Sequence, residues 1–346
     1  KQINKSAAKN IFINIGGGNI KFQNSRGIVA VSRADNEIYP DEVDRAIKAS
    51  QSINIGPNRM IIHTITREFV VDGIGEISDP LGMTGSRLEV NSLIIDAFKP
   101  TVNNLIKAVE AAGGKIGGLI YNPLASGRSV LTKAQKELGA TVIDIGFSTT
   151  SMATYEEGKL IQAAVFPVGA SNITNDLAIG LKCPVKTAEI IKLSFGSALS
   201  REISNKEKID LHQIDESLKS TVSRRFISEI IEVRLAEIFE LVNNELKLVG
   251  KSGKLPAGAA ITGAGAKIPD IVELAKQELK LPAQLGIPEL SDVEFVSGEF
   301  KAQLEDSEFS VCTGLLFWAI DQSLKDQNWS MAKNGLISKI LRYFLP

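Results

Sequence analysis

The stretch TVIDIGFSTTSMATYEEGKL (residues 141–160) places an acid, a glycine and four hydroxyl residues close together. Asp144 and Gly146 end a short β-branched run, and the hydroxyl residues follow Phe147. Small residues that offer backbone N–H groups and hydroxyls in sequence suit an anionic group such as phosphate. The flanking apolar runs predict a strand, a tight turn and a returning strand. An ordinary buried hairpin explains these residues equally well, so both interpretations stay open on this stretch alone.

Two later stretches could also receive an anionic or flat ligand. Gly169 ends a predicted strand, and the residues up to Asp176 start a helix with capping residues, so its N-terminus could face an anion. The sequence GAGA (residues 263–266) predicts a small-residue turn between a strand and a helix over 268–281, which Pro269 can start. Such a turn allows a flat ligand to approach closely. A plain helix cap and ordinary packing of helix on sheet are the respective alternatives.

Charged residues on two predicted helices can be explained without a ligand. Glu189 and Lys192 lie three positions apart on one face of a helix predicted over 187–193, where a surface ion pair is the default interpretation. A long helix is predicted over 221–248, and its polar faces carry the charged residues Arg224, Arg225, Arg234 and Glu237. Solvated charge is the default interpretation for that helix.

The C-terminal residues NGLISKILRYFLP (334–346) depart from the globular pattern. They follow a predicted core helix (311–324) and a short polar link (325–330). At about 100° per residue, one half of the helical wheel is apolar and the other is polar or cationic. The residues assigned to membrane contact are Trp329, Leu336, Ile337, Lys339, Ile340, Leu341, Arg342, Phe344 and Leu345. The pattern predicts a helix in the plane of a membrane surface, with docking on the protein itself or on a neighbour as the alternative.

The elements that would position these residues are strands and helices in alternation. NIFINIGGGNIKF (10–22) predicts a β-hairpin through its glycines, and a phosphate loop is the less favoured alternative because no helix follows. Tyr39-Pro40-Asp41-Glu42 predicts a helix start. The first 90 residues or so therefore form a small α+β module. From about residue 100 the alternation indicates an α/β domain, and residues 201–220 look like an inserted subdomain.

Composition and charge exclude several classes of protein. The 346 residues suffice for two domains. A formal charge of -1 gives no indication that the protein binds nucleic acid. Cys183 and Cys312 are too few for a disulfide framework or a zinc site, and a reduced cytoplasm fits them best. His63 and His212 have no nearby ligand partners, which argues against a metal cluster or a serine-histidine hydrolase. We find no signal-peptide pattern and no membrane-spanning run, and because the chain begins at Lys1 rather than Met we expect an N-terminal piece to be absent.

Seven blocks in order carry a resemblance over nearly the whole chain. They are DPLGMTGSRLEV, NLIKAVEAAG, SVLTKAQKELGATVIDIG, VFPVGASNITNDLAIGL, TAEIIKL, EIIEVRLAEIFELV and ITGAGAKIP. Their order is far more specific than any one block. The chain resembles the FtsA family of bacterial cell-division actin homologues. The resemblance implies the two-lobed actin-like (ribonuclease H-like) α/β fold shared by actin, Hsp70 and the sugar kinases, with a small extra α+β subdomain near the N-terminus.

The resemblance also implies subdomains and partners. The expected parts are the extra subdomain (1–90), the rest of the first large subdomain (91–140), the second large subdomain (141–200 and 258–305), an inserted subdomain (201–257), a returning helix (306–325), and a linker with a membrane helix (326–346). In this family ATP or ADP, with magnesium, sits between the two halves. The family polymerises and links FtsZ C-terminal tails, and later division proteins, to an anionic membrane surface. Its place is the cytoplasmic face of the bacterial inner membrane at the division site.

Site residues follow from the positions that match. The implied nucleotide-binding residues are Asp144, Gly146, Ser148, Thr149 and Thr150 in the second phosphate loop, Gly169 and Asp176 beside it, Glu189 and Lys192 at ribose and adenine, and Gly263, Ala264 and Gly265 in the adenosine turn. This match replaces the surface-pair interpretation of Glu189 and Lys192. The FtsZ tail, which is acidic and apolar in this family, is expected in the subdomain that carries Arg224, Arg225 and Arg234. No metal ligand set is expected in the protein alone.

The chain departs from the family's second phosphate loop, Asp-(hydrophobic)-Gly-Gly-Gly-Thr-(Thr)-Asp. Phe147 and Ser148 replace two glycines, and Ser151 replaces the acid. A Cβ at those sites is expected to restrict the backbone and the approach to phosphate, and loss of the acid removes a group that could orient magnesium or water. Ala264 also stands where glycine is usual. The sequence IGGGN aligns with the extra subdomain, so the first phosphate loop should lie upstream of Lys1, and we expect poor nucleotide binding by this chain.

The preferred function is therefore a non-catalytic membrane adaptor and filament former, with nucleotide as a structural or regulatory ligand and at most weak ATP hydrolysis. The first alternative is an active ATPase or phosphotransferase of the same fold, in which Asp144 is a candidate base only if the missing half completes the cleft. The second is a PilM-like pilus-assembly actin homologue. Such a protein shares the extra subdomain but is not expected to end in a membrane helix.

Overall fold

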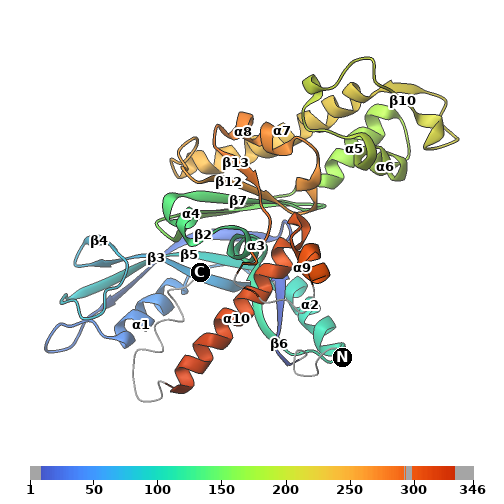
Figure 1. Cartoon of the computed structure of the whole chain (residues 1–346). Coiled ribbons are helices and arrows are strands. Elements are labelled where there is room, and N and C mark those ends of the chain that lie inside the picture. Colours follow the sequence, from blue (N-terminus) through green and yellow to red (C-terminus); the bar gives the residue numbers. More distant parts are fainter. Residues whose placement is uncertain (1–8, 292, 294–297, 332–346) are drawn as a thin grey trace. The chain divides into compact units, whose positions relative to one another are not determined.

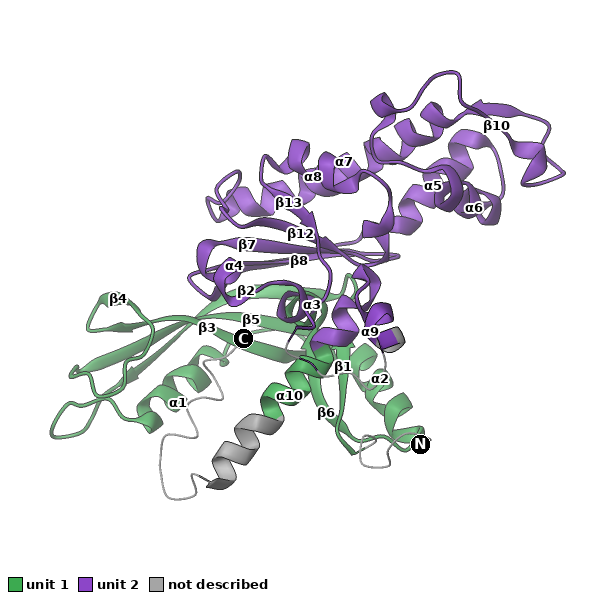
Figure 2. Ribbon diagram, in the orientation of Figure 1, with its two compact units in different colours: residues 1–125, 315–346 green, residues 126–314 purple. Residues whose placement is uncertain are grey.

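Two compact units make up the structure, a computed structural model that describes residues 9–291, 293 and 298–331. Residues 1–125 and 315–346 form unit 1, and residues 126–314 form unit 2 (Figure 2). Helices α3 (Asn122–Val130) and α10 (Ser310–Met331) each contain residues of both units.

A four-stranded antiparallel sheet in the order β2-β5-β3-β4 is the centre of unit 1 (Figure 1). Its strands are β2 (Ile20–Ala30), β3 (Arg59–Val71), β4 (Ile74–Ile77) and β5 (Arg87–Phe98). Helix α1 (Pro40–Ser50) packs on one face of the sheet, because apolar residues at helical spacing form its buried side, namely Val43, Ala46 and Ile47. One helix on one antiparallel sheet is the α+β arrangement that the sequence predicts here.

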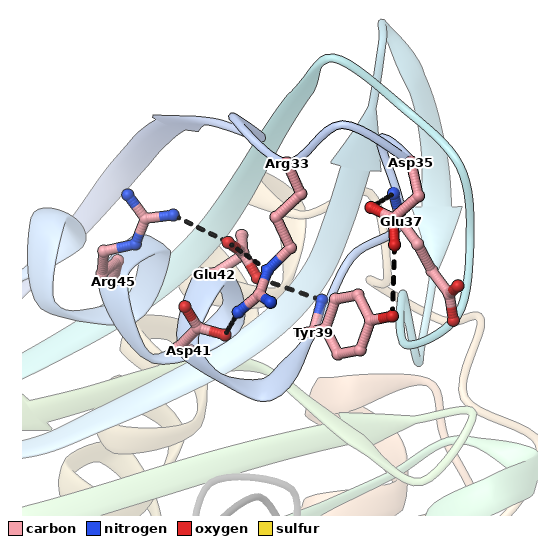
Figure 3. A network of polar contacts seen from close by, with 7 residues as sticks. All are labelled: Arg33, Asp35, Glu37, Tyr39, Asp41, Glu42 and Arg45. Carbon is pink, nitrogen blue, oxygen red and sulfur yellow. Dashed lines mark hydrogen bonds and ion pairs between the residues drawn. The ribbon is translucent and has the colours of Figure 1, made fainter.

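Polar contacts hold the start of α1, as Figure 3 shows. Tyr39 is the N-cap, and its backbone N–H donates to the Glu42 carboxylate at 3.1 Å. The Arg33 guanidinium carbon lies 4.3 Å from the centroid of the Tyr39 ring, and Arg33 donates to Asp41 at 2.8 Å. Pro40 takes the first helical position, where the missing N–H has no intrahelical acceptor in any case. The helix start predicted at Tyr39 and Pro40 is confirmed.

The hairpin predicted over residues 10–22 is wrong in its pairing. Both strands form, but β1 (Ile11–Ile15) pairs in parallel with β6 (Ile116–Tyr121), whereas β2 pairs with β5. The glycines 16–18 therefore connect two sheets. A parallel partner about a hundred residues away leaves no turn pattern in the sequence, because parallel strands need a long crossover connection. Helix α2 (Lys99–Ala111) precedes β6, in keeping with the strand and helix alternation predicted from about residue 100.

A histidine, a tyrosine and a tryptophan link β3, β6 and α10 within unit 1. The Nε2 atom of His63 accepts a hydrogen bond from the backbone N–H of Tyr121 at 3.0 Å. The His63 and Trp318 ring centroids are 6.2 Å apart, and Trp318 Nε1 donates to the Leu124 carbonyl at 3.4 Å. Burial of the imidazole lowers the pKa of His63 to about 4. His63 is therefore neutral at pH 7, as its acceptor role requires.

A five-stranded sheet in the order β13-β12-β7-β8-β9 is the centre of unit 2. Its strands are β7 (Ala140–Ile145), β8 (Thr150–Glu156), β9 (Lys159–Phe166), β12 (Gly258–Thr262) and β13 (Ala283–Leu285). β7 pairs in parallel with β12 and antiparallel with β8, so the hairpin predicted over 141–160 is confirmed. The short turn after β8 has positive φ at both Glu157 and Gly158, which suits a tight two-residue hairpin.

Helices cover this sheet and extend beyond it. They are α3, α4 (Lys133–Leu138), α5 (Ala170–Leu181), α6 (Val185–Phe195), α7 (Arg224–Leu248), α8 (Ile271–Leu279) and α9 (Gly298–Leu304). A two-stranded ribbon of β10 (Lys208–Asp210) and β11 (Thr221–Ser223) lies in the segment expected to be inserted. The long helix α7 joins the parts of unit 2 because one apolar side of it is buried along its length, including Ile227, Leu235, Phe239 and Leu246.

Two predicted boundaries are wrong. Helix α8 begins at Ile271 rather than at Pro269, because Asp270 before it adopts the left-handed conformation with φ 64° and acts as N-cap. The polar link predicted over 325–330 is helical, since α10 runs without interruption to Met331. No proline or glycine occurs in α10 after Gly314, so the polar residues extend the helix instead of ending it.

None of the helices in the described ranges is long and apolar enough to cross a membrane. The in-plane helix predicted over 334–346 lies outside the described residues. Among the residues assigned to membrane contact, Trp329 is part of α10.

Candidate functional site

Asp144 lies near the end of β7, in the middle of the five-stranded sheet. It is directly opposite Ser151 on β8 and Thr262 on β12. The residue is only 7% exposed, and its carboxylate accepts no hydrogen bond from any residue that the structure describes. Burial raises the pKa of Asp144 to about 6. A buried carboxylate with unused acceptor oxygens is available to a ligand at this end of β7.

The loop between β7 and β8 offers free backbone donors. The N–H of Gly146 donates to the Thr149 carbonyl at 2.9 Å and closes the loop. The N–H groups of Phe147, Ser148 and Thr149 donate to nothing within the described part of the chain. Successive N–H groups in a turn form a concave site for an anion. The loop therefore leaves three N–H groups in a row for a ligand, and phosphate binding there stays a prediction.

The side chains that replace glycine do not strain this loop. Neither Phe147 nor Ser148 has a positive φ, so this loop conformation accommodates a Cβ at both positions without backbone strain. Phe147 is 72% exposed, and Ser148 is also exposed. The remaining effect of Phe147 is on access to the loop, not on the conformation of its backbone.

The N-terminus of α5 holds the loop. The Ala170 N–H donates to the Gly146 carbonyl at 2.9 Å, and the Ser171 N–H donates to the Phe147 carbonyl at 2.7 Å. A Cβ at Gly169 would lie 2.7 Å from each of these carbonyl oxygens, so only glycine allows the helix to come this close. The suggestion that the first N–H groups of α5 face an anion is wrong, because the loop uses them. Gly169 therefore positions the loop, because its lack of a side chain lets the start of α5 reach the loop carbonyls.

Glu189 and Lys192 on α6 form a largely buried cluster with α5. Lys192 Nζ lies 2.8 Å from the Glu189 carboxylate and donates to the Thr174 hydroxyl at 2.9 Å. That hydroxyl donates to the same Glu189 oxygen at 2.5 Å. The Lys192 side chain is 5% exposed and that of Glu189 is 37% exposed. Burial alone would raise the pKa of Glu189, but the hydrogen bonds from Lys192 and Thr174 outweigh it and lower the pKa.

The turn after β12 lies against the end of β7. Gly263 has φ +85°, and a Cβ there would lie 2.4 Å from Oδ1 of Asp144. A Cβ at Gly265 would lie 2.4 Å from Cγ2 of Ile145. Ala264 between them is exposed. The turn thus requires its two glycines for packing, and it accepts a side chain at Ala264.

Asp176 on α5, expected beside the phosphate loop, is bound by Arg234 on α7. Arg234 Nε donates to Oδ2 of Asp176 at 2.6 Å, and Nη2 donates to Oδ1 at 3.0 Å. The remaining nitrogen, Nη1, donates to Glu237 at 2.5 Å. Two residues predicted for two different ligands therefore pair with each other.

The other two predicted arginines also have acidic partners. Arg224 donates to the Phe195 carbonyl at 3.1 Å and to the Glu207 carboxylate at 3.0 Å, so it fixes the start of α7. Arg225 donates to Glu229 one turn further along the helix, at 3.3 Å. The three arginines are partly exposed, and each offers further N–H groups to a partner.

Apolar side chains are exposed beside these arginines. Phe226 and Val233 on α7 are 42% and 71% exposed, and they form one stripe with Ile230 between them. A Cβ at Gly180 of α5 would lie 2.7 Å from Cδ1 of Ile230, so the two helices touch there. Its neighbour Ile179 is 76% exposed. We name as the α5–α7 surface the apolar residues Ile179, Phe226, Ile230 and Val233 with Arg225 and Arg234, which flank the stripe on the helical wheel.

No cluster of three or more metal-ligating side chains occurs among the residues that the structure covers. Ser151, which the resemblance aligns with a second acid, is buried opposite Asp144. Asp144 is therefore the acidic side chain at this end of the hairpin.

Comparisons with known proteins agree with this architecture. The sequence model of the family Cell division protein FtsA matches residues 141–314, which is most of unit 2. The model of the SHS2 domain inserted in FtsA matches residues 17–96, which include the four-stranded sheet and α1. Cell division protein FtsA of Neisseria meningitidis serogroup B is 33% identical over 94% of this chain and 76% of its own length. The chain belongs to the FtsA family.

Other FtsA relatives and one solved structure fit this assignment. Cell division protein FtsA of Pseudomonas aeruginosa is 35% identical over 80% of this chain, which spans 66% of that relative's length. The solved PilM-PilN type IV pilus biogenesis complex has the same fold, with a TM-score of 0.63 and 16% identity over 90% of this chain and 80% of the solved chain. The predicted family and the predicted actin-like α/β fold with an extra N-terminal subdomain are confirmed, and the chain is a cell-division actin homologue.

Two contacts among the FtsA motifs are not evident in the sequence. Thr174 on α5 bridges Glu189 and Lys192 on α6, and no local pattern predicts a contact between these two helices. The contact between Gly180 and Ile230 is likewise not evident, because the two residues lie on helices far apart in the chain.

Proposed function

We propose that this FtsA-family chain tethers FtsZ filaments to the cytoplasmic membrane and forms actin-like filaments, with ATP as a structural or regulatory ligand. The α5–α7 surface is the observation that carries the proposal. It combines exposed apolar side chains on α7 with arginines whose acidic partners, Glu229 and Glu237, are themselves about half exposed. The carboxylates of an acidic, apolar FtsZ tail can replace these weakly held partners while its apolar side chains cover Phe226 and Val233.

A pair of substitutions on one helix tests the FtsZ contact. Val233→Glu places a charge in the middle of the α5–α7 surface, and we expect the Kd for a labelled peptide of the organism's own FtsZ tail to rise at least about tenfold. Leu248→Glu is the matched control, because Leu248 is 76% exposed and lies about 22 Å further along α7. Fluorescence anisotropy measures both. Equal affinity in the two variants would show that the tail binds elsewhere.

The nucleotide part of the proposal is supported by the loop after β7. Its three free N–H groups fit a phosphate, Asp144 fits a water bound to magnesium, and the Glu189 carboxylate fits a ribose hydroxyl. A bound ATP or ADP would supply the negative charge that satisfies the loop donors. Because Ser151 stands opposite Asp144, we propose at most weak ATP hydrolysis and a non-catalytic role.

Titration with a fluorescent ATP analogue tests the expectation of poor nucleotide binding directly, and a Kd in the micromolar range would contradict it. Lys192→Met removes the cation that orders Glu189 and Thr174, so we expect weaker binding than in the wild type. Lys186→Met, an exposed lysine on the same helix, is the control. Hydrolysis faster than about 1 s⁻¹, a common turnover rate for enzymes, would contradict the non-catalytic role.

The membrane part of the proposal rests on the sequence of residues 334–346. We place the chain on the cytoplasmic face of the inner membrane at the division site, where later division proteins meet it, with the subdomain boundaries expected from the sequence. Deletion of residues 334–346 should abolish sedimentation with anionic vesicles while leaving FtsZ-tail binding intact. Unchanged sedimentation of the deletion variant would remove the membrane tether from the proposal.

The pilus-assembly alternative has a specific observation behind it, which is the TM-score of 0.63 with the PilM-PilN complex. At 16% identity this likeness concerns the fold alone. The FtsA relatives are about twice as similar in sequence, at 33% and 35% identity. We therefore propose the cell-division function.

A further inference from the structure

Helix α5 touches both proposed ligand sites of unit 2. Its first N–H groups hold the carbonyls of the phosphate loop, and Thr174 one turn later binds the Glu189–Lys192 cluster. Further along the same helix, Asp176 pairs with Arg234, and Gly180 packs on Ile230. Since an α-helix is stiff over this length, a displacement at one end of α5 is transmitted to the other.

The pair of Asp176 and Arg234 is a strong contact between α5 and α7. It is bidentate, with N···O distances of 2.6 and 3.0 Å, and the two side chains are only 28% and 24% exposed. A two-point contact between a planar guanidinium and a carboxylate fixes orientation as well as distance. A change in Arg234 therefore reaches α5 through Asp176.

Arg234 also belongs to the surface proposed for the acidic tail. Two of its nitrogens, Nε and Nη2, are committed to Asp176, and Nη1 is committed to Glu237. A tail carboxylate that takes the same bidentate geometry must compete with Asp176 for this edge of the guanidinium. A nucleotide that ordered the loop, which is hydrogen-bonded to α5, would act in the opposite sense, because it would favour the position of α5 in which Asp176 binds Arg234.

We propose that Asp176 is a positioning residue that couples the two sites negatively, so that nucleotide on the β7–β8 loop and an acidic peptide on the α5–α7 surface weaken each other. The inference rests on the proposed function and names its regulation. By linkage, each ligand must lower the affinity of the other by the same factor. Asp176 itself need not touch either ligand.

The test is the Kd of the FtsZ-tail peptide, measured on the full-length protein with and without a saturating non-hydrolysable ATP analogue. In the wild type we expect nucleotide to raise the peptide Kd at least about fivefold. Asp176→Asn keeps the shape of the side chain but frees Arg234. This variant should bind the peptide more tightly without nucleotide and lose the dependence on nucleotide.

Glu237→Gln is the matched control. It removes the other acidic partner of the same guanidinium, but Glu237 lies on α7 itself and cannot transmit a change to α5. We expect it to keep the fivefold dependence. Thermal melting and direct nucleotide titration of each variant show whether it is folded and loaded.

The outcomes separate the two proposals. If either ligand fails to bind the wild-type protein, the proposed function fails and the coupling fails with it. If both ligands bind but the peptide Kd is unaffected or lowered by nucleotide, the coupling alone is wrong. Dependence that survives in folded Asp176→Asn, or is lost in Glu237→Gln, would also overturn the role of Asp176.

Discussion

Gly263 and Asp144 approach so closely that a Cβ on Gly263 would lie 2.4 Å from the Asp144 carboxylate. Gly263 also has φ +85°, a conformation that other residues rarely adopt. The turn after β12 and the acid near the end of β7 therefore depend on each other for space. This contact brings two stretches of the sequence, more than a hundred residues apart, side by side.

Gly263→Ala should destabilise the protein by about 3 kcal/mol, because it combines overpacking against Asp144 with backbone strain. Urea denaturation followed by circular dichroism measures the change. Ala264→Gly, one position further on and exposed, should change stability by no more than about 1 kcal/mol. Similar effects of the two substitutions would mean that the turn is not packed on β7 in solution.

Asp144 should make stability fall as pH rises from about 4 to about 6 in the absence of nucleotide. Its folded-state pKa of about 6 is above its ordinary value of 3.8, so the folded state holds a proton that the unfolded state has released. At pH 7 the variant Asp144→Asn should be more stable than the wild type by up to about 3 kcal/mol, and the difference should vanish below pH 4. Unfolding free energies of both proteins across this pH range provide the measurement. A constant difference between them would contradict the raised pKa.

His63 should have the opposite dependence in nearly the same pH window. Its folded-state pKa of about 4 is below the ordinary 6.5, so stability is lost as pH falls from 6.5 towards 4. His63→Gln should lose this contribution, and its stability relative to the wild type should improve as the solution is acidified. His212→Gln, at an exposed histidine, is the control and should behave as the wild type does. The same urea series at several pH values measures all three proteins.

The contact of Glu189 with Lys192 should stabilise the protein only while the carboxylate is ionised. The pKa of Glu189 is lowered, so its contribution is complete above the ordinary value of 4.5 and disappears as pH falls through the lower folded value. The stability difference between wild type and Glu189→Gln should therefore be larger at pH 7 than at pH 3. Lys192→Met should cost roughly 1 to 3 kcal/mol at pH 7, because it removes the donor to the Thr174 hydroxyl and one of the two donors to the Glu189 carboxylate. A difference for Glu189→Gln that grows at low pH would contradict this account.

The candidate site was predictable where its residues are close in sequence. The β7–β8 hairpin, the helix start after Gly169 and the small-residue turn at 263–266 all follow from patterns within a few residues. The matched family blocks then assigned them to one ligand. Which of their N–H groups stay free could not be predicted, because the Ala170 and Ser171 donors are used by a loop from another part of the chain.

The structure accommodates the residues that replace glycines of the family pattern. Phe147 and Ser148 stand at glycine positions of the family pattern, and neither residue has a positive φ. Ala264 also stands at such a position, and it is exposed. The glycines that matter are Gly263 and Gly265, because neighbouring strand atoms occupy the space of a Cβ. The effect of replacing a glycine can be judged only when the φ angle at that position and the atoms around it are known.

The family, the actin-like fold and most helices and strands can be predicted from the sequence, since they depend on apolar periodicity, capping residues and the order of the matched blocks. The partners that lie far apart in the chain are known only from the folded structure. Strand β1 pairs with β6 instead of β2, and Asp176 pairs with Arg234, which lies 58 positions away in the sequence. Such contacts form because burying a strand's polar backbone groups or a charged side chain costs free energy unless these groups are paired. No local sequence pattern specifies which distant residue will be the partner.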